Sequence, residues 1–174
     1  VLDEAYTEFL PAAKRSDSIA WLQQFPNLIV VRTFSKAYGL AGLRVGFALA
    51  SSEIIDMLNR VRQAFNVNSL AQAAACAALD DLAFLRESVR VNNEGMQQIT
   101  DAFRRLGISF IESSGNFVTF HCGDAKMLNQ FMLERGVIVR PLAGYGMSNS
   151  LRVSIGLPSE NARFIEVLEE AMAD

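Results

Sequence analysis

The sequence contains few cysteines and a single histidine, and each scarcity excludes a kind of site. Cys76 and Cys122 are far apart and form no C-x-x-C pair, so a disulfide scaffold is not expected and a reducing compartment fits. Cys76 lies in an alanine run, which predicts a small buried residue. The only histidine, His121, ends an apolar strand pattern and has no recognisable partners for a metal. We therefore expect no metal site.

Long apolar runs and a strong charge of one sign are also absent. No apolar run reaches the roughly 18 residues needed to span a bilayer, and no signal peptide is visible. The net charge of -3 gives no reason to expect a nucleic acid or an anionic membrane as partner. The 51% hydrophobic and 20% charged residues are typical of a chain with a sizeable buried core. These features favour a cytoplasmic protein.

The first part of the chain has the pattern of a sheet with covering helices. Residues 28–34 (LIVVRTF) form a continuous apolar run, typical of a strand covered on both faces in a parallel sheet, and residues 45–50 form a second such run. Ser52 is expected to cap a helix whose apolar positions extend to Phe65. Ser69 is expected to cap an alanine-rich helix.

A long amphipathic helix is predicted from about residue 82 to residue 106, ended by Gly107. Strands and helices alternate after it, which predicts a compact α+β domain. The chain therefore divides into residues 1–82, part of an α/β sheet domain, and residues 83–174. In this second part the predicted strands are 108–112, 117–121, 137–140 and 151–155, and the predicted helices are capped by Asp124 and Ser159.

The segment with the clearest chemistry is residues 32–46, RTFSKAYGLAGLRVG, between the two predicted strands. A lysine at the end of a buried strand is costly unless its charge is neutralised or used, and a cofactor aldehyde that condenses with Lys36 would explain its position. Hydroxyls at Thr33 and Ser35 and the guanidinium of Arg44 suit a phosphate. The alternative is a loop lysine near a surface arginine. The glycines do not form G-x-G-x-x-G, so a dinucleotide site is not supported.

This segment resembles the lysine motif S-K-x-x-G-L-A-G-x-R-x-G of the class I/II aminotransferases of fold-type I, and every fixed position is present. The resemblance implies that Lys36 binds pyridoxal 5'-phosphate (PLP) covalently and then acts as the catalytic base. It also implies that Ser35 and Arg44, together with Thr33, hold the cofactor phosphate. The expected fold is α/β: the C-terminal part of a PLP-dependent transferase large domain, followed by a small α+β C-terminal domain.

The first six residues, VLDEAY, resemble the D-E-A-Y strand end of the same family. This implies that Asp3 pairs with the protonated ring nitrogen of PLP and that Tyr6 contacts its 3-hydroxyl. A buried carboxylate suits this role because PLP accepts electrons only while its ring nitrogen stays protonated. The spacing between Asp3 and Lys36 leaves room for a crossover helix near Trp21.

Residues 150–156, SLRVSIG, resemble the family strand whose arginine binds the substrate carboxylate, which implies this role for Arg152. A planar guanidinium binds a carboxylate through two parallel hydrogen bonds; a structural ion pair is the alternative. Arg140, before a proline, is a candidate for a second anionic group of the substrate or else a surface residue. Asn116, within S-G-N-F, resembles a segment of the small domain that faces the active site, and this signal is weaker.

Within the family, the segments FNVNS at 65–69 and VRP at 139–141, with the Arg152 strand, resemble histidinol-phosphate aminotransferases. This implies a homodimeric enzyme of histidine biosynthesis that moves an amino group from a small-molecule donor, histidinol phosphate, to a 2-oxo acid, 2-oxoglutarate. Aromatic aminotransferases and threonine-phosphate decarboxylases share much of the pattern. A non-catalytic regulatory module of the same fold is a further alternative.

The resemblance covers the C-terminal half of such enzymes. The chain begins with Val1, without an initiator methionine, in the middle of a strand pattern. The family's phosphate-binding helix N-terminus, ring-stacking aromatic residue and asparagine beside the 3-hydroxyl have no counterpart in residues 1–174. We therefore expect this chain by itself to bind PLP poorly and to be inactive.

Overall fold

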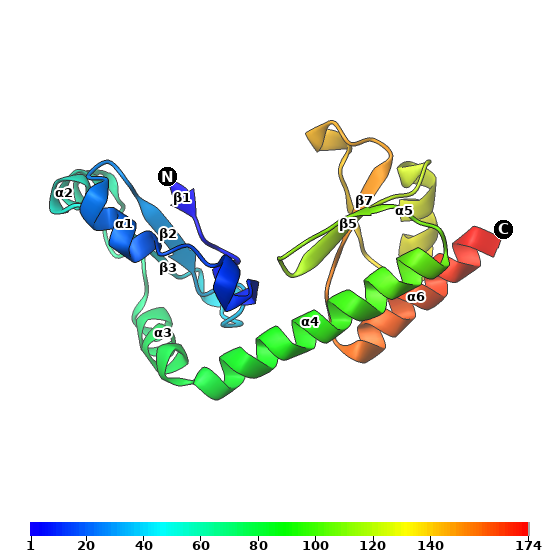
Figure 1. Ribbon diagram of the computed structural model, residues 1–174, viewed down its shortest axis with the longest axis horizontal. Coiled ribbons are helices and arrows are strands. Elements are labelled where there is room, and N and C mark those ends of the chain that lie inside the picture. Colours follow the sequence, from blue (N-terminus) through cyan, green and yellow to red (C-terminus); the bar gives the residue numbers. More distant parts are fainter. Residues whose placement is uncertain (174) are drawn as a thin grey trace. The chain divides into compact units, whose positions relative to one another are not determined.

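The chain folds into two compact units, which a computed structural model describes for residues 1–173 (Figure 1). The first unit is Val1–Val89 and the second is Arg90–Asp174, so the division falls inside the long helix α4 (Leu82–Arg105). The helix confirms the prediction for residues 82–106. The domain boundary at residue 82, where α4 begins, remains a prediction.

A three-stranded sheet forms the centre of the first unit. Its order is β1-β2-β3, with β1 (Leu2–Asp3) parallel to β2 (Val30–Thr33) and β3 (Gly46–Leu49) antiparallel to β2. Both strands predicted here are confirmed, but the prediction that the second is covered on both faces is wrong, since Phe47 is exposed. The connection from β2 to β3 holds the short 3₁₀ helix η3 (Ala41–Leu43) in place of the crossover α-helix that usually joins parallel strands.

The caps of α2 (Ser52–Val61) and α3 (Ser69–Asp80) lie one residue before the predicted caps, Ser52 and Ser69, which are instead the first residues of the two helices. Ser51 caps α2, where its Oγ accepts a hydrogen bond from the Ile54 amide, and Asn68 caps α3. Phe65 lies beyond the end of α2 and is almost fully exposed, so its predicted place on the helix is wrong. The remaining elements are α1 (Ser18–Gln24), which contains Trp21 as predicted, and the 3₁₀ helices η1 (Thr7–Phe9), η2 (Ala12–Lys14) and η3 (Ala41–Leu43).

Cys76, on α3, is exposed, so its predicted burial is wrong. The buried positions of α3 are Ala71 and Ala75, four residues apart on one face. Cys76 follows Ala75 by one residue, which is about 100° around an α-helix. The alanine run therefore predicts a helix correctly without indicating which of its faces is buried.

An antiparallel four-stranded sheet of order β4-β5-β7-β6 forms the second unit together with its helices. The predicted strand at 117–121 and the helix capped by Asp124 are confirmed, and Gly107 follows α4 with the positive φ of 69° expected of a helix end. The strands are β4 (Phe110–Ile111), β5 (Phe117–His121), β6 (Arg140–Pro141) and β7 (Ser150–Ser154), and the further helices are α5 (Ala125–Glu134), η4 (Ala143–Tyr145) and α6 (Pro158–Ala173).

Two predictions in the second unit are wrong. The strand expected at 137–140 forms only from Arg140, because the chain leaves α5 through Gly136 and reaches the sheet edge four residues later. The last helix starts at Pro158 rather than after Ser159. There Glu160 Oε2 accepts a hydrogen bond of 2.7 Å from the amide of Leu157, which satisfies a donor at the helix start.

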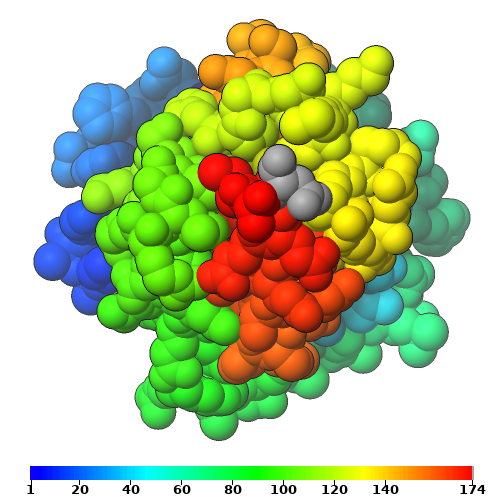
Figure 2. Space-filling model, turned by 90° about the vertical axis from the view of Figure 1, so that its right-hand side faces the viewer, coloured from blue at the N-terminus to red at the C-terminus, as the bar shows by residue number. Residues whose placement is uncertain are grey.

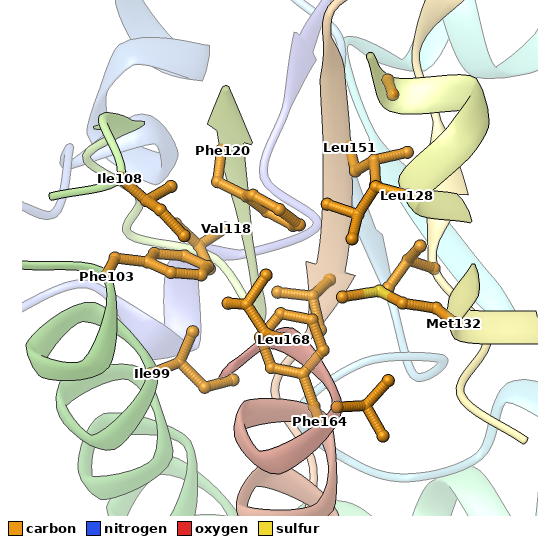
Figure 3. Close-up of a cluster of buried hydrophobic side chains, with 14 residues drawn as sticks. Ile99, Phe103, Ile108, Val118, Phe120, Leu128, Met132, Leu151, Phe164 and Leu168 are labelled. Carbon is orange, nitrogen blue, oxygen red and sulfur yellow. The ribbon is translucent and has the colours of Figure 1, made fainter. Parts of the chain in front are cut away.

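One continuous core fills the space between this sheet and its helices (Figure 3). Val118 and Phe120 of β5 and Leu151 of β7 alternate with outward residues and face Phe103 of α4 and Phe164 of α6. The rings of Phe103 and Phe120 are 4.8 Å apart between centroids. On the outside, α6 lies between α4 and α5 (Figure 2).

Candidate active site

The carboxyl ends of β1 and β2 bring the first group of predicted residues to one edge of the sheet. The strands are parallel, with Asp3 in register with Val31, so the residues that follow each strand emerge at the same edge. Lys36, three residues beyond β2, holds its Nζ 5.4 Å from the centroid of the Tyr6 ring. Asp3 is exposed at this edge, where its Oδ1 accepts a hydrogen bond of 3.0 Å from the Ala5 amide.

The loop that carries Lys36 is held by its own backbone. The amide of Gly39 donates to the carbonyl of Lys36 at 2.9 Å, and Gly39 has a φ of 72°, a conformation that favours glycine. Phe34 and Ala37, on either side of Lys36, are buried, whereas Lys36 itself is half-buried. The loop is therefore anchored on both sides of the lysine, and the lysine itself keeps part of its surface exposed.

Thr33, Ser35 and Arg44 border this loop. Thr33 Oγ1 accepts a hydrogen bond of 3.0 Å from the amide of Ser35, so this hydroxyl oxygen stabilises the turn. The amide of Phe34 donates to the carbonyl of Val45, which places Ser35 and Arg44 at the next positions of the two chains. Arg44 is exposed, has a φ of 54° and donates from Nη1 to the carbonyl of Ala41 at 3.0 Å.

The chemistry at this edge fits a cofactor with an aldehyde, a basic ring nitrogen and a phosphate. Within residues 1–173 no carboxylate forms an ion pair with Lys36, so its amine is not neutralised by a neighbour. Asp3 supplies an exposed carboxylate and Tyr6 a phenol at the same edge. Ser35 and Arg44 supply a hydroxyl and a guanidinium, which suit a phosphate.

A second group of predicted residues lies in the second unit, on the face of the sheet opposite to the core. Arg140 of β6 and Arg152 of β7 are direct cross-strand partners, so their side chains leave the same face of the sheet at neighbouring positions. Thr119 of β5 is the partner of Arg152 on its other side. The guanidinium of Arg152 lies over the ring of Phe117, 4.5 Å from its centroid.

Like charges at directly opposite positions destabilise a sheet unless an anion lies between them. Among the described residues, neither Arg140 nor Arg152 forms an ion pair with a carboxylate. Arg140 is exposed and Arg152 is half-buried. The pair is suited to a ligand with two negative groups.

Asn116 precedes β5 and is half-buried, and its carbonyl accepts a hydrogen bond of 2.9 Å from the amide of Ile155. The preceding carbonyl, of Gly115, accepts a hydrogen bond of 3.2 Å from Nδ2 of the buried Asn92 on α4. These two bonds tie the S-G-N-F segment to a helix and to the end of β7. Asn92 was missed from the sequence because it lies within the helical pattern and far from the motif.

The sequence also gave no role to Glu4, which is buried although it lies between the candidate residues Asp3 and Tyr6. Its Oε2 accepts hydrogen bonds from Arg32 Nε at 2.9 Å and from Ser18 Oγ at 3.0 Å. Glu4 and Arg32 both belong to segments that carry the family resemblance. Their opposite charges on neighbouring strands were the one signal in the sequence that could have indicated this pair.

The pKa values of two further side chains, Glu8 and Tyr38, are influenced by Arg32 and are raised. Burial raises the pKa of Glu8, an effect that its own backbone hydrogen bond and the charges of Arg32 and Arg15 oppose. Burial, followed by the negative charge of Glu8, raises the pKa of Tyr38. The charge of Arg32 thus acts on both side chains.

Within residues 1–173, no group of three or more His, Cys, Asp or Glu side chains is arranged to hold a metal ion. His121 instead has its Nδ1 2.8 Å from the hydroxyl of Ser150, on the neighbouring strand. No helix in the described part of the chain is long and apolar enough to cross a membrane.

The chain belongs to the aminotransferase class I and II family, whose model matches residues 1–168. Histidinol-phosphate aminotransferase 1 of Dechloromonas aromatica (strain RCB) is 58% identical over 172 residues, which are 99% of this chain and 48% of the relative. The chain thus spans about half the length of the curated relatives it matches.

Solved structures of related sequence share the fold. Histidinol-phosphate aminotransferase from Sinorhizobium meliloti, in complex with pyridoxal-5'-phosphate, superposes with a TM-score of 0.86 at 30% identity, covering 99% of this chain and 48% of that one. L-threonine-O-3-phosphate decarboxylase from Porphyromonas gingivalis superposes with a TM-score of 0.83 at 25% identity, covering 99% and 55%. The predicted fold class, part of a PLP-dependent transferase, is confirmed.

Proposed function

We propose that this chain is part of a PLP-dependent aminotransferase that moves an amino group between histidinol phosphate and 2-oxoglutarate in histidine biosynthesis. The observation that carries the proposal is the position of Lys36, which lies over the ring of Tyr6 at the carboxyl edge of β1 and β2 and has no carboxylate partner in residues 1–173. The identity of 58% with a histidinol-phosphate aminotransferase supports the choice of substrate.

Each residue at the sheet edge would have a separate task. Lys36 would hold PLP covalently, and its amine, once released, would move a proton from the substrate Cα. Asp3 would keep the ring nitrogen protonated, Tyr6 would donate a hydrogen bond to the 3-hydroxyl, and Ser35, Arg44 and Thr33 would line the phosphate. PLP, when bound, supplies the electron sink that makes the Cα proton removable.

The arginine pair in the second unit would select the substrate. Arg152, stacked on Phe117, would bind the carboxylate of glutamate or 2-oxoglutarate, and Arg140 beside it would meet the phosphate of histidinol phosphate. Asn116 would border the same substrate. Because both arginines leave one face of the sheet, one pocket would accept two differently charged substrates in turn.

The role of Lys36 is tested by Lys36→Ala in the full-length protein. The wild type, mixed with PLP, should show a visible absorbance that borohydride abolishes irreversibly. Borohydride reduces the C=N bond that forms when an amine condenses with an aldehyde. The variant should lose this absorbance and nearly all turnover, because it has lost both the attachment point and the base. An unchanged, reducible chromophore in Lys36→Ala would assign the attachment to another residue.

The substrate is tested by comparing amino donors at equal concentration. Histidinol phosphate should react much faster than phenylalanine or aspartate. Arg140→Gln should raise KM for histidinol phosphate more than KM for glutamate, because Arg140 would meet the phosphate. Arg152→Gln should raise KM for glutamate, because Arg152 would meet the carboxylate, which glutamate carries and histidinol phosphate lacks. A preference for an aromatic amino acid would overturn the choice of substrate and leave the role of Lys36 intact.

Decarboxylation of threonine phosphate is a second candidate, supported by the superposition with the decarboxylase from Porphyromonas gingivalis. Threonine phosphate carries a phosphate and a carboxylate in one molecule, and the arginine pair would suit both groups. The arginine pair by itself therefore does not discriminate between threonine phosphate and the phosphate-bearing histidinol phosphate. Carbon dioxide released from threonine phosphate, without any need for a 2-oxo acid, would favour this activity. The identity of 58% with an aminotransferase favours the first candidate.

The family resemblance also supports a cytoplasmic homodimer. Light scattering of the full-length protein at several concentrations would test the oligomeric state. A single monomeric mass at all concentrations would contradict it.

A further inference from the structure

The buried carboxylate of Glu4 is held by three donors on one oxygen. Oε2 accepts from Arg32 Nε at 2.9 Å, lies 2.8 Å from Arg32 Nη2, and accepts from Ser18 Oγ at 3.0 Å. The side chain of Glu4 is 6% exposed and that of Arg32 is 29% exposed. A carboxylate at such depth is stable only when its partners replace water, so the cluster holds its three members in one geometry.

These three residues belong to three different elements. Glu4 directly follows β1, and its amide donates to the carbonyl of Val31 at 2.9 Å, which extends the pairing of β1 with β2 by one residue. Arg32 lies within β2, and Ser18 is the first residue of α1, the helix that connects the two strands. The cluster therefore joins the carboxyl ends of β1 and β2 to the start of α1.

The cluster lies close along the chain to both halves of the candidate site. Glu4 is between Asp3 and Tyr6, and Arg32 is four residues before Lys36. The Lys36 Nζ and the Tyr6 ring come from the segments after β1 and after β2, and their separation of 5.4 Å depends on how these segments are joined. Within residues 1–173, Glu4 and Arg32 form the ion pair that links the two strands.

We propose that Glu4 and Arg32 are positioning residues, which hold the Asp3–Tyr6 segment at a fixed distance from Lys36. This inference rests on the proposed function, because it assigns the pair to the PLP site. Neither residue contacts the reacting atoms; they act through Asp3, Tyr6 and Lys36. Small displacements of such groups are expensive, since a misplacement of about 1 Å costs roughly a hundredfold in rate.

The experiment uses the full-length protein and three variants: Glu4→Gln, Arg32→Met and the double variant. Each single change should lower kcat by about tenfold or more, with little change in KM for glutamate, and should move the pH at which the visible absorbance of the lysine-bound cofactor changes. Asp56→Asn is the matched control, because the exposed pair of Asp56 and Arg60 lies in the same unit, on α2. It should leave kcat and the absorbance unchanged.

The double variant separates positioning from stability. Removing one partner leaves an uncompensated buried charge, so each single variant should unfold at a lower urea concentration than the double variant, which has no buried charge. The double variant should regain stability but keep the defects in kcat and in the absorbance, because the link between the strands is still missing. Recovery of both properties together with stability would overturn the proposal and make the pair merely structural.

The wild type keeps this test distinct from the proposed function. If the wild type shows no lysine-bound absorbance with PLP, both the proposed function and the positioning role are overturned. If the wild type shows the absorbance and Glu4→Gln has the same kcat and pH response, only the positioning role is overturned.

Discussion

The two units of the chain differ in how completely each buries its apolar side chains. The second unit has one continuous core of phenylalanine and aliphatic residues, in which Phe103, Phe120 and Leu151 have no exposed surface. The main cluster of the first unit is much smaller, and two of its four buried members are alanines, Ala71 and Ala75. Around it, Val61, Phe65 and Leu70 are largely exposed.

The difference matters because the apolar surface removed from water is the main source of stability. The second unit has the sheet-on-helix arrangement and the side chains to remain folded alone. The first unit holds its strands mainly through backbone pairing and the buried Glu4–Arg32 pair, and a charge pair is weak evidence for stability. We therefore expect the unit with Lys36 to depend on other apolar surface, and the unit with Arg152 to be independent.

The largest expected effect is on separate expression of the two parts. Residues 82–174, which keep the whole of α4, should show helical circular dichroism and a cooperative urea transition, because their core is complete. Residues 1–81 should show neither a cooperative transition nor a dispersed NMR spectrum, because a small core does not offset the lost chain entropy. A sharp transition for residues 1–81 would contradict the comparison.

An intermediate effect is expected at Gly95, where α4 passes close to the turn before α6. A Cβ at this position would lie 2.6 Å from Asn161 Nδ2 and 2.6 Å from Ile155 Cγ2. Asn161 is buried, and its side chain is held by hydrogen bonds to the amide and the carbonyl of Gly156, so it has little freedom to move.

Gly95→Ala should therefore lower the free energy of unfolding of residues 82–174 by about 1–2 kcal/mol, because overpacking exceeds the gain in helix propensity. The matched control is Gly144→Ala, where a Cβ meets no atom within 4 Å. Urea unfolding followed by circular dichroism measures both variants. Equal urea midpoints for Gly95→Ala and Gly144→Ala would contradict this prediction and show that α4 shifts to make room for the Cβ at little cost.

The smallest expected effect concerns the two thiols. Burial, together with the negative charge of Asp124, raises the pKa of Cys122 to about 11. The thiolate is the reactive form, so Cys122 should react slowly with iodoacetamide at pH 8 and speed up as the pH approaches 11. Exposed Cys76 should be alkylated first, which mass spectrometry of Cys76→Ser and Cys122→Ser would verify. Faster alkylation of Cys122 at pH 8 would contradict its burial.

Local signals in the sequence predicted most of the elements. Asp124 was correctly identified as a helix cap and Gly107 as a helix end, because capping and positive φ depend on a few neighbouring residues. The direction of β3 and the start of β6 were not predicted, since each depends on the space left by the preceding connection. The lysine loop was located from a contiguous motif, without knowledge of what lies against it.

By itself, therefore, the sequence determined the family, the position of the candidate lysine, Lys36, and the approximate order of strands and helices. These follow from contiguous motifs and from short periodic patterns. Only the tertiary structure decided which charges meet. Arg140 faces Arg152 through the pairing of β6 with β7, and Glu4 meets Ser18 and Arg32 across separations of 14 and 28 residues. Such contacts depend on strand register and on helix packing, which bring distant residues together only after the chain has folded.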